Sequence, residues 1–125
     1  MVFDTDIFIA VQRGSGKAAD LITTAERRCI SIFTYMEFVH GSLDRKQLKG
    51  NRDFLKDLEF ETLPLTENIG HRASIYVEQF SLSHSMRAGD AIVAATAAEH
   101  GLALVSGNAR HFRQIPDLEL KVLRI

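Results

Sequence analysis

Two kinds of hydrophobic pattern alternate along the chain. Five short apolar runs bounded by turn residues have the character of strands, at residues 2–3, 29–33, 60–65, 102–105 and 120–125. Between them, apolar residues recur at helical spacing over residues 15–25, 34–41, 44–58, 66–80 and 91–98. Strands that alternate with helices predict the α/β class, with a central parallel sheet covered on both faces. Pro64 and the alternation of the last run place those two strands at sheet edges.

The segment 86–108 has the clearest pattern. Residues 91–98 are apolar or small apart from Thr96, so this helix is predicted to be buried. Gly101 follows it, as expected where a helix ends in a left-handed cap, and the strand 102–105 comes next. Asp90 therefore stands in the first turn of a helix that is otherwise uncharged.

Topology predicts that four distant polar residues meet. Asp4 ends the first strand, Glu37 is expected in the first turn of the helix after the second strand, and Asn108 follows the strand 102–105. The carboxyl ends of parallel strands share one edge, where sites in such sheets lie. A ten-residue helix of about 15 Å matches a five-residue strand of about 16 Å, so the antiparallel helix that Asp90 begins starts at that same edge.

Carboxylates gathered at one edge repel one another, and a hard divalent cation offsets that repulsion. Mg²⁺ or Mn²⁺ takes oxygen ligands, polarises a phosphate and lowers the pKa of a bound water. The sequence therefore predicts phosphodiester hydrolysis by a metal-activated water. Ser106 is a candidate to orient a water or a metal ligand, or it simply closes the turn.

Each candidate also has a structural interpretation. Asp4 and Asp90 suit helix N-termini, Asn108 suits a turn, and Thr34 with Glu37 matches a capping box. Caps and ligands are not exclusive, because helix starts are where this fold presents groups to ligands. The shared edge, rather than any single residue, supports a site.

Basic residues form two groups. The first group lies on one face of the helix 44–58 and consists of Arg45, Lys46, Lys49 and Arg52. By default this is a face exposed to solvent, and the alternative is that it contacts RNA or a partner protein. The second flanks the acidic residues in sequence and is the better candidate for phosphate contact, with Arg87, Arg110 and Arg113.

Composition narrows the class of protein. At 125 residues the chain has the size of one domain, 1–125, and at 46% hydrophobic content it can bury a core. Fifteen basic against 16 acidic residues exclude a strongly basic field, so any RNA contact must be local. One cysteine, Cys29, excludes a disulfide framework, and no run suits a membrane span or a signal peptide. We expect a cytoplasmic protein without membrane contact.

Four segments resemble the blocks of the PIN-domain nucleases in order and spacing, most strongly those of the VapC toxins of type II toxin–antitoxin pairs: VFDTDIFI, TYMEFVHG, GDAIVAATAAEHGLALVSGN and ARHF. The resemblance implies a single α/β/α sandwich with strand order 3-2-1-4-5 and an Mg²⁺- or Mn²⁺-dependent endoribonuclease. It assigns the acidic metal site to Asp4, Glu37 and Asp90, with Asn108 at a fourth position that is often Asp. Asp6 stands where Asn or Cys is common, as a supporting residue.

The resemblance also implies partners: an RNA substrate, a second copy in a homodimer, and a VapB-like antitoxin that inserts a basic side chain among the carboxylates. Three alternatives remain, one of which is metal-free acid–base cleavage of RNA by two histidines. Asn108 leaves open a catalytically weak RNA- or peptide-binding module. Asp4-Thr5-Asp6 matches the nucleophile motif of haloacid-dehalogenase-type phosphatases, although Ala94 stands where their second acid belongs.

Overall fold

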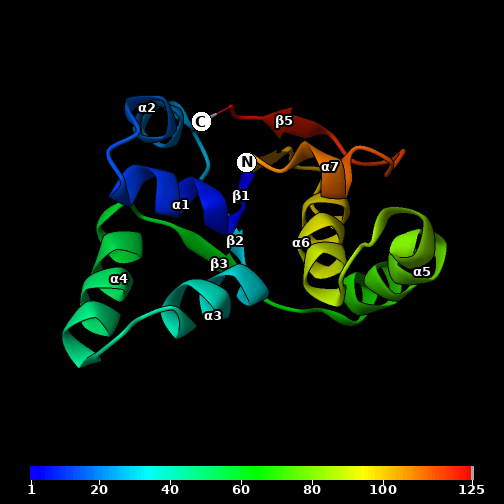
Figure 1. The fold of residues 1–125 in the computed structure, drawn as a ribbon, viewed down its shortest axis with the longest axis horizontal. Coiled ribbons are helices and arrows are strands. Elements are labelled where there is room, and N and C mark those ends of the chain that lie inside the picture. The colour runs from blue at the N-terminus through cyan, green and yellow to red at the C-terminus, as the bar shows by residue number, and fades with distance from the viewer. Residues whose placement is uncertain (125) are drawn as a thin grey trace.

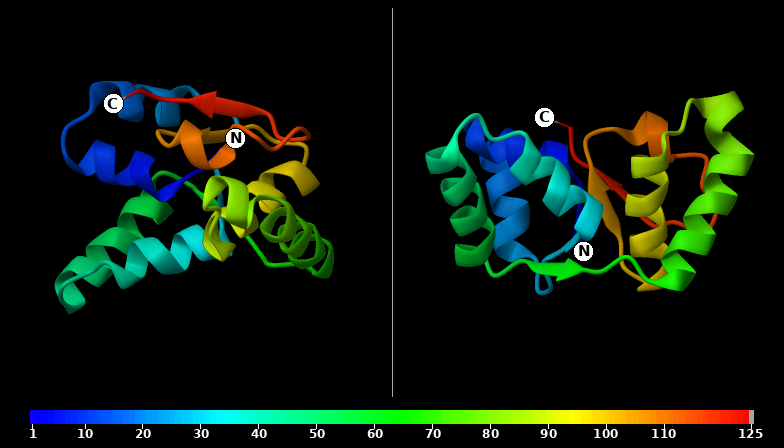
Figure 2. Two further views of the ribbon diagram at one scale, coloured as in Figure 1. Left: turned by 45° about the vertical axis from the view of Figure 1, so that its right-hand side comes forward. Right: turned by 90° about the horizontal axis from the view of Figure 1, so that it is seen from below.

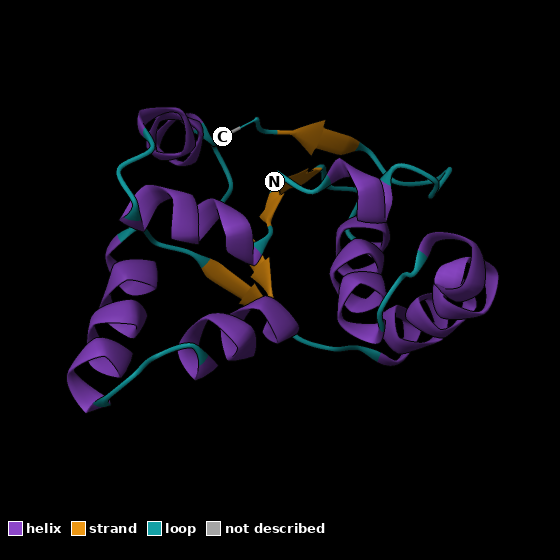
Figure 3. Ribbon diagram, viewed as in Figure 1, coloured by secondary structure: helices purple, strands orange, loops and turns teal. Residues whose placement is uncertain are grey.

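A five-stranded parallel sheet forms the centre of the computed structural model, which describes residues 1–124 (Figures 1 and 3). Its order, β3-β2-β1-β4-β5, confirms the predicted topology, with β3 and β5 at the edges. All the pairings are parallel. The strands are short, spanning β1 Val2–Phe3, β2 Cys29–Ser31, β3 Glu61–Leu63, β4 Leu104–Ser106 and β5 Leu120–Val122.

Seven helices connect and cover the strands within the described residues. They span α1 Thr5–Gln12, α2 Gly16–Thr24, α3 Ile32–His40, α4 Arg45–Asp57, α5 Glu67–His84, α6 Ala88–Glu99 and α7 Ala109–Phe112. Five of them have a side-chain N-cap of the ordinary polar type, at Asp4, Ser15, Ser31, Asp44 and Thr66. No helix within residues 1–124 combines the length and the apolar character needed to cross a bilayer.

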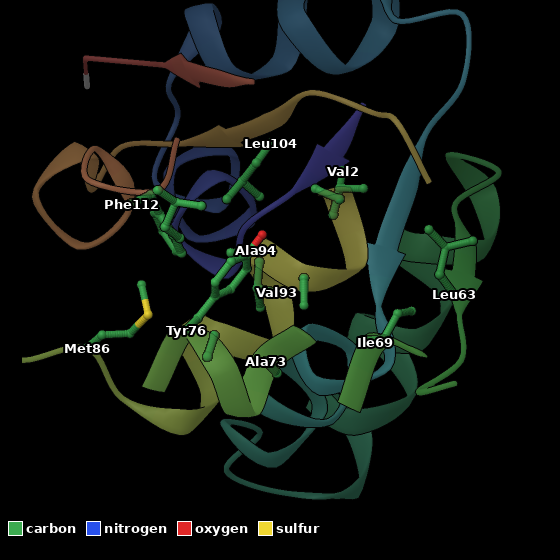
Figure 4. Packing of buried hydrophobic residues seen from close by; sticks show 14 of the residues in the cluster. Val2, Leu63, Ile69, Ala73, Tyr76, Met86, Val93, Ala94, Leu104 and Phe112 are labelled. Atoms are coloured by element: carbon green, nitrogen blue, oxygen red, sulfur yellow. The ribbon is translucent and has the colours of Figure 1, made fainter. Parts of the chain in front are cut away.

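Side chains of the central strands alternate between two cores. Val2 and Leu104 face a cluster built with α5 and α6, in which Ala94 of the buried helix and Phe112 of α7 take part (Figure 4). Phe3 and Val105 face the opposite cluster, built with α1 and α2. Helices therefore lie on both faces of the sheet (Figure 2), as the near-continuous apolar strands predict.

Several element boundaries differ from the sequence pattern. The strand expected over 29–33 ends at residue 31, because Ser31 caps α3 and Ile32 already belongs to that helix. Helix α4 passes through Gly50 without a break. The pattern predicts no helix over residues 5–12 or 109–112, whereas the structure has α1 and α7 there. At the starts of α1 and α3, a side-chain cap hydrogen bond from Asp4 or Ser31 marks the boundary.

Candidate functional site

A pocket of about 320 Å³ opens where the carboxyl ends of the strands meet the starts of α1 and α6. Asp4, Glu37, Asp90 and Asn108 all line it, so the structure brings the four distant residues together. The complete lining is Asp4, Thr5, Asp6, Phe33, Glu37, Arg87, Gly89, Asp90, Asn108 and His111.

Asp4 links the first strand to the start of α1. Its Oδ1 accepts a hydrogen bond from the Thr5 amide at 2.9 Å, and its Oδ2 accepts one from Ser106 Oγ at 2.9 Å. Burial, together with the nearby charge of Asp6, raises the pKa of Asp4 to about 6, although both hydrogen bonds favour the charged form. Ser106 is fully buried, and its hydroxyl also accepts from the Asn108 amide at 3.0 Å, so it both holds Asp4 and closes the turn.

Asp6 contributes an unpartnered oxygen. Its Oδ2 accepts a hydrogen bond from the Gly107 amide at 2.9 Å, which ties α1 to the turn after β4. Its Oδ1 is buried and has no hydrogen-bond partner among residues 1–124. Burial is the main cause that raises the pKa of Asp6, and the Gly107 bond acts in the opposite direction. An unsatisfied buried carboxylate oxygen is costly, so this atom is available to a cation or a ligand donor.

Glu37 lies in the second turn of α3, not in the first as expected, because the helix begins at Ile32. The capping box of Thr34 with Glu37 is therefore wrong: Ser31 is the N-cap, and its hydroxyl accepts from the Thr34 amide at 3.0 Å. The Glu37 carboxylate instead accepts a hydrogen bond from the Thr5 hydroxyl, across from α3 to α1. This contact draws Glu37 toward the pocket that Asp4 lines.

Asp90 both caps its helix and faces the pocket. Its Oδ2 accepts from the Arg87 amide at 3.4 Å, so the cap interpretation holds. The same oxygen lies 3.1 Å from Nδ1 of His111 on α7, and that ring nitrogen lies 3.2 Å from Nδ2 of the Asn108 side chain. His111 thereby connects two of the four candidate residues.

A close approach of α3 and α6 shapes one wall of the pocket. A β-carbon built on Gly89 would lie 2.3 Å from Cζ of Phe33, nearer than any side chain can stand. Glycine at this position therefore lets the Phe33 ring sit against the start of α6, directly beside Asp90.

Sequence reasoning gave no site role to four of the lining residues, which are Thr5, Phe33, Gly89 and His111. His111 stands three positions after Asn108 on a short helix, a spacing that places the two side chains together once ARHF is taken as helical. Thr5 lies between two aspartates, and that position was a usable signal. Phe33 stands in an apolar run and offered no signal.

The candidate arginines separate into two locations. Arg87 lines the acidic pocket. Arg110 and Arg113 do not, and they line a neighbouring hollow together with His84 and Gln114. On α4, Lys49 and Arg52 line a hollow beside the aromatic rings of Tyr35 and Phe60.

The donor chemistry of the pocket suits a hard divalent cation. Every candidate ligand offers oxygen, two aspartates have raised pKa values, and one buried oxygen has no partner. Across residues 1–124, however, no three acidic, histidine or cysteine side chains form a ready-made metal-binding group. Each carboxylate accepts a hydrogen bond from a different group. The pocket therefore fits a hard divalent cation in the type and charge of its ligand atoms.

Comparison with known proteins gives a consistent result. A family model described as PIN domain matches residues 1–118. Ribonuclease VapC10 of Mycobacterium tuberculosis is 29% identical over 124 residues, which cover 95% of this chain and 90% of that relative. A toxin–antitoxin complex from Klebsiella pneumoniae has a TM-score of 0.78 at 27% identity, covering 94% of this chain and 93% of that one. VapBC-1 from nontypeable Haemophilus influenzae has a TM-score of 0.80 at 19% identity, covering 98% of each chain, and shows the fold alone.

Proposed function

Because the chain belongs to the PIN domain family, we propose that it is a Mg²⁺- or Mn²⁺-dependent endoribonuclease and the toxin of a VapBC-type toxin–antitoxin pair. One observation carries the proposal: side chains from four segments far apart in the sequence, Asp4, Glu37, Asp90 and Asn108, line one pocket at the carboxyl edge of the sheet. The similarity to ribonuclease VapC10 over nearly the whole chain supports the ribonuclease activity.

Asp4, Glu37 and Asp90 would hold the cation, with Asn108 as a neutral fourth oxygen donor. The bound ion supplies the means to polarise a phosphodiester and to acidify an attacking water. Ser106 keeps one Asp4 oxygen in place, and Thr5 does the same for Glu37. These positioning contacts set the carboxylates before RNA arrives.

Arg87 would bind the RNA at this pocket. It lines the pocket beside Asp90 and has no ion pair among residues 1–124. A guanidinium binds phosphate oxygens through paired N–H groups, so Arg87 can orient the reacting phosphate and offset repulsion from the carboxylates.

The partners are part of the same proposal. The likeness to the toxin–antitoxin complex from Klebsiella pneumoniae supports a VapB-like antitoxin as the protein partner. We place residues 1–125 in a single PIN domain that pairs as a homodimer, and the acidic pocket would receive a basic side chain of the antitoxin.

The decisive experiment is a cleavage assay on RNA with the purified chain and its Asp90→Asn variant. We expect cleavage with Mn²⁺ or Mg²⁺, complete inhibition by EDTA, and products with 5′-phosphate ends. Cleavage that resists EDTA and leaves 2′,3′-cyclic phosphates would contradict the proposal and indicate catalysis by histidines.

A binding module that does not cut RNA is the second candidate, favoured by one observation: residues 1–124 contain no preformed group of three metal ligands. It predicts RNA binding without cleavage in any divalent metal. The phosphatase alternative loses its support, since Ala94 is fully buried in α6 and the motif's second acid is missing there.

A further inference from the structure

A second hollow, of about 510 Å³, has two arginines and no carboxylate among its lining residues, and we call it the basic hollow. Its lining residues are His84 at the end of α5, Arg110 on α7, and Arg113 and Gln114 just after α7. Helix α7 is common to both hollows, because His111 lines the acidic pocket and Arg110 lines the basic one. Phe112, which follows these two residues, is buried in the core and fixes the helix in place.

The absence of carboxylates distinguishes this hollow. Four other hollows on the described surface contain arginine or lysine, and each also contains an acidic residue. Arg72, for example, lies in one of them with Glu99 and Asp117 and forms ion pairs with both. Arg110 and Arg113 have no ion pair within residues 1–124. Their charge is therefore available to an anion from outside the chain.

The two arginines suit a phosphate in arrangement as well as in charge. They are three positions apart on and just after α7, a spacing that places both side chains over one face. Both are exposed, so little desolvation opposes ligand binding. Gln114 is held in place through its side-chain amide, which donates to the His111 carbonyl at 2.8 Å, and it completes the wall with neutral groups.

The segment between α5 and α6 connects the two hollows. His84 belongs to the basic hollow and Arg87, three residues later, to the acidic pocket. Met86 between them is buried, and Ser85 has a left-handed backbone with φ of 53°, which turns the chain sharply at this point. Arginine side chains therefore line both hollows, Arg87 the acidic pocket and Arg110 with Arg113 the basic hollow.

We propose that the basic hollow formed by His84, Arg110, Arg113 and Gln114 binds a backbone phosphate of the RNA outside the reacting position. This inference rests on the proposed nuclease function and names the side of the pocket over which the strand passes. A pocket of carboxylates repels RNA, and phosphate contacts elsewhere must supply affinity. The basic hollow supplies such phosphate contacts, and its arginines do not stand among the carboxylates of the acidic pocket.

The test measures binding of an unstructured single-stranded RNA 12-mer at several salt concentrations, in the Asp90→Asn background so that no cleavage interferes. The test pair is Arg110→Gln with Arg113→Gln. Loss of two phosphate contacts should flatten the slope of log affinity against log salt by about 1.4. When salt rises from 50 to 200 mM, the Asp90→Asn parent should therefore lose about sevenfold more RNA affinity than the variant that also carries the two glutamines. Arg110→Lys with Arg113→Lys should retain most of the slope.

A matched control removes the same charge elsewhere. Arg45→Gln with Arg52→Gln acts on α4, whose exposed basic face is the competing RNA surface. We expect its slope to equal that of the parent. An unchanged salt slope for the double glutamine variant at Arg110 and Arg113 would overturn the inference, as would a change of slope seen only in the α4 variant. A double lysine variant that binds RNA no better than the double glutamine variant would also overturn it.

The outcome is separable from that of the proposed function. Cleavage by the wild-type chain that Asp90→Asn abolishes would support the nuclease whatever the salt slopes show. Thermal melts within a degree or two of the parent show that the pairs remain folded, as expected for exposed side chains.

Discussion

Ser106 Oγ donates a 2.9 Å hydrogen bond to Asp4 Oδ2, although the two residues are 102 positions apart in the chain. The bond joins the ends of two neighbouring parallel strands, β1 and β4, beneath the acidic pocket. It also accounts for a fully buried hydroxyl, which otherwise would be costly to bury. Asp4 is therefore held by the strand that leads to Asn108.

Ser106→Ala should destabilise the fold by about 1–3 kcal/mol, because it leaves the backbone amide of Asn108 without its acceptor and Asp4 Oδ2 without its donor. The measurement is chemical unfolding in metal-free buffer. A double-mutant cycle with Asp4→Asn provides the control: Ser106→Ala should cost less in that background. Equal costs in both backgrounds would show that the Ser106–Asp4 bond contributes nothing.

Stability should depend on pH through Asp4, whose pKa rises from 3.8 to about 6 on folding. A carboxyl with a raised folded-state pKa binds its proton more tightly in the native state than in the unfolded state. Its contribution to the free energy of unfolding is therefore least favourable at neutral pH and improves as pH falls from about 6 to about 4. The full effect approaches about 3 kcal/mol, at 1.36 kcal/mol per pKa unit.

Comparing wild type with Asp4→Asn in metal-free buffer isolates this effect. The variant should be the more stable protein at pH 7.5, and its advantage should shrink at pH 4.5. A difference that is independent of pH would contradict the burial of a charged Asp4.

Asp90→Asn should lower RNA cleavage by more than about a hundredfold, because loss of a direct metal ligand costs more than loss of the groups that orient one. The fold should remain, since an asparagine oxygen can still accept from the Arg87 amide at the start of α6. Cleavage rates and thermal melts measured together separate the two effects. An active Asp90→Asn protein would remove Asp90 from the metal site.

Gly89→Ala should destabilise the protein by about 1–3 kcal/mol, since its new methyl group would overlap the Phe33 ring. Adding Phe33→Leu should recover part of that loss. The matched control is Gly50→Ala in the middle of α4, where a β-carbon meets nothing within 4 Å. That change should stabilise the helix by about 0.5–1 kcal/mol.

Mn²⁺ should raise the melting temperature of the wild-type chain and EDTA should reverse the rise, because a ligand that binds only the native state adds about 2.7 kcal/mol at a hundred times its dissociation constant. Asp4→Asn and Asp90→Asn should each respond less. A rise of the same size in all three proteins would place the ion elsewhere.

The periodicity of apolar residues predicted the sheet, its parallel direction and the burial of α6, since these follow from patterns repeated over whole segments. The family resemblance supplied the strand order. Element ends were less predictable because single hydrogen bonds set them. Ser31 and Thr34 are both good caps, and only the bond from the Thr34 amide to Ser31 decides where α3 begins.

The site was predictable to the level of which elements meet, but not to the level of side-chain pairing. Topology placed Asp4, Glu37, Asp90 and Asn108 at one edge. The link from Thr5 to Glu37 and that from His111 to Asp90 depend on the rotation of α1 and α7 about their axes, which no local pattern encodes.

Strand β1 has only two residues, and both are fully buried on opposite faces of the sheet. Adding a single residue between Phe3 and Asp4 would move the side chains of β1 to the opposite faces of the sheet. If β1 instead kept its register, the insertion would rotate α1 and its aspartates out of the pocket. The chain should thus tolerate changes of length at the exposed Gly14 turn but none at the start of α1. The shortest segment of the fold is the one whose length is most strictly constrained.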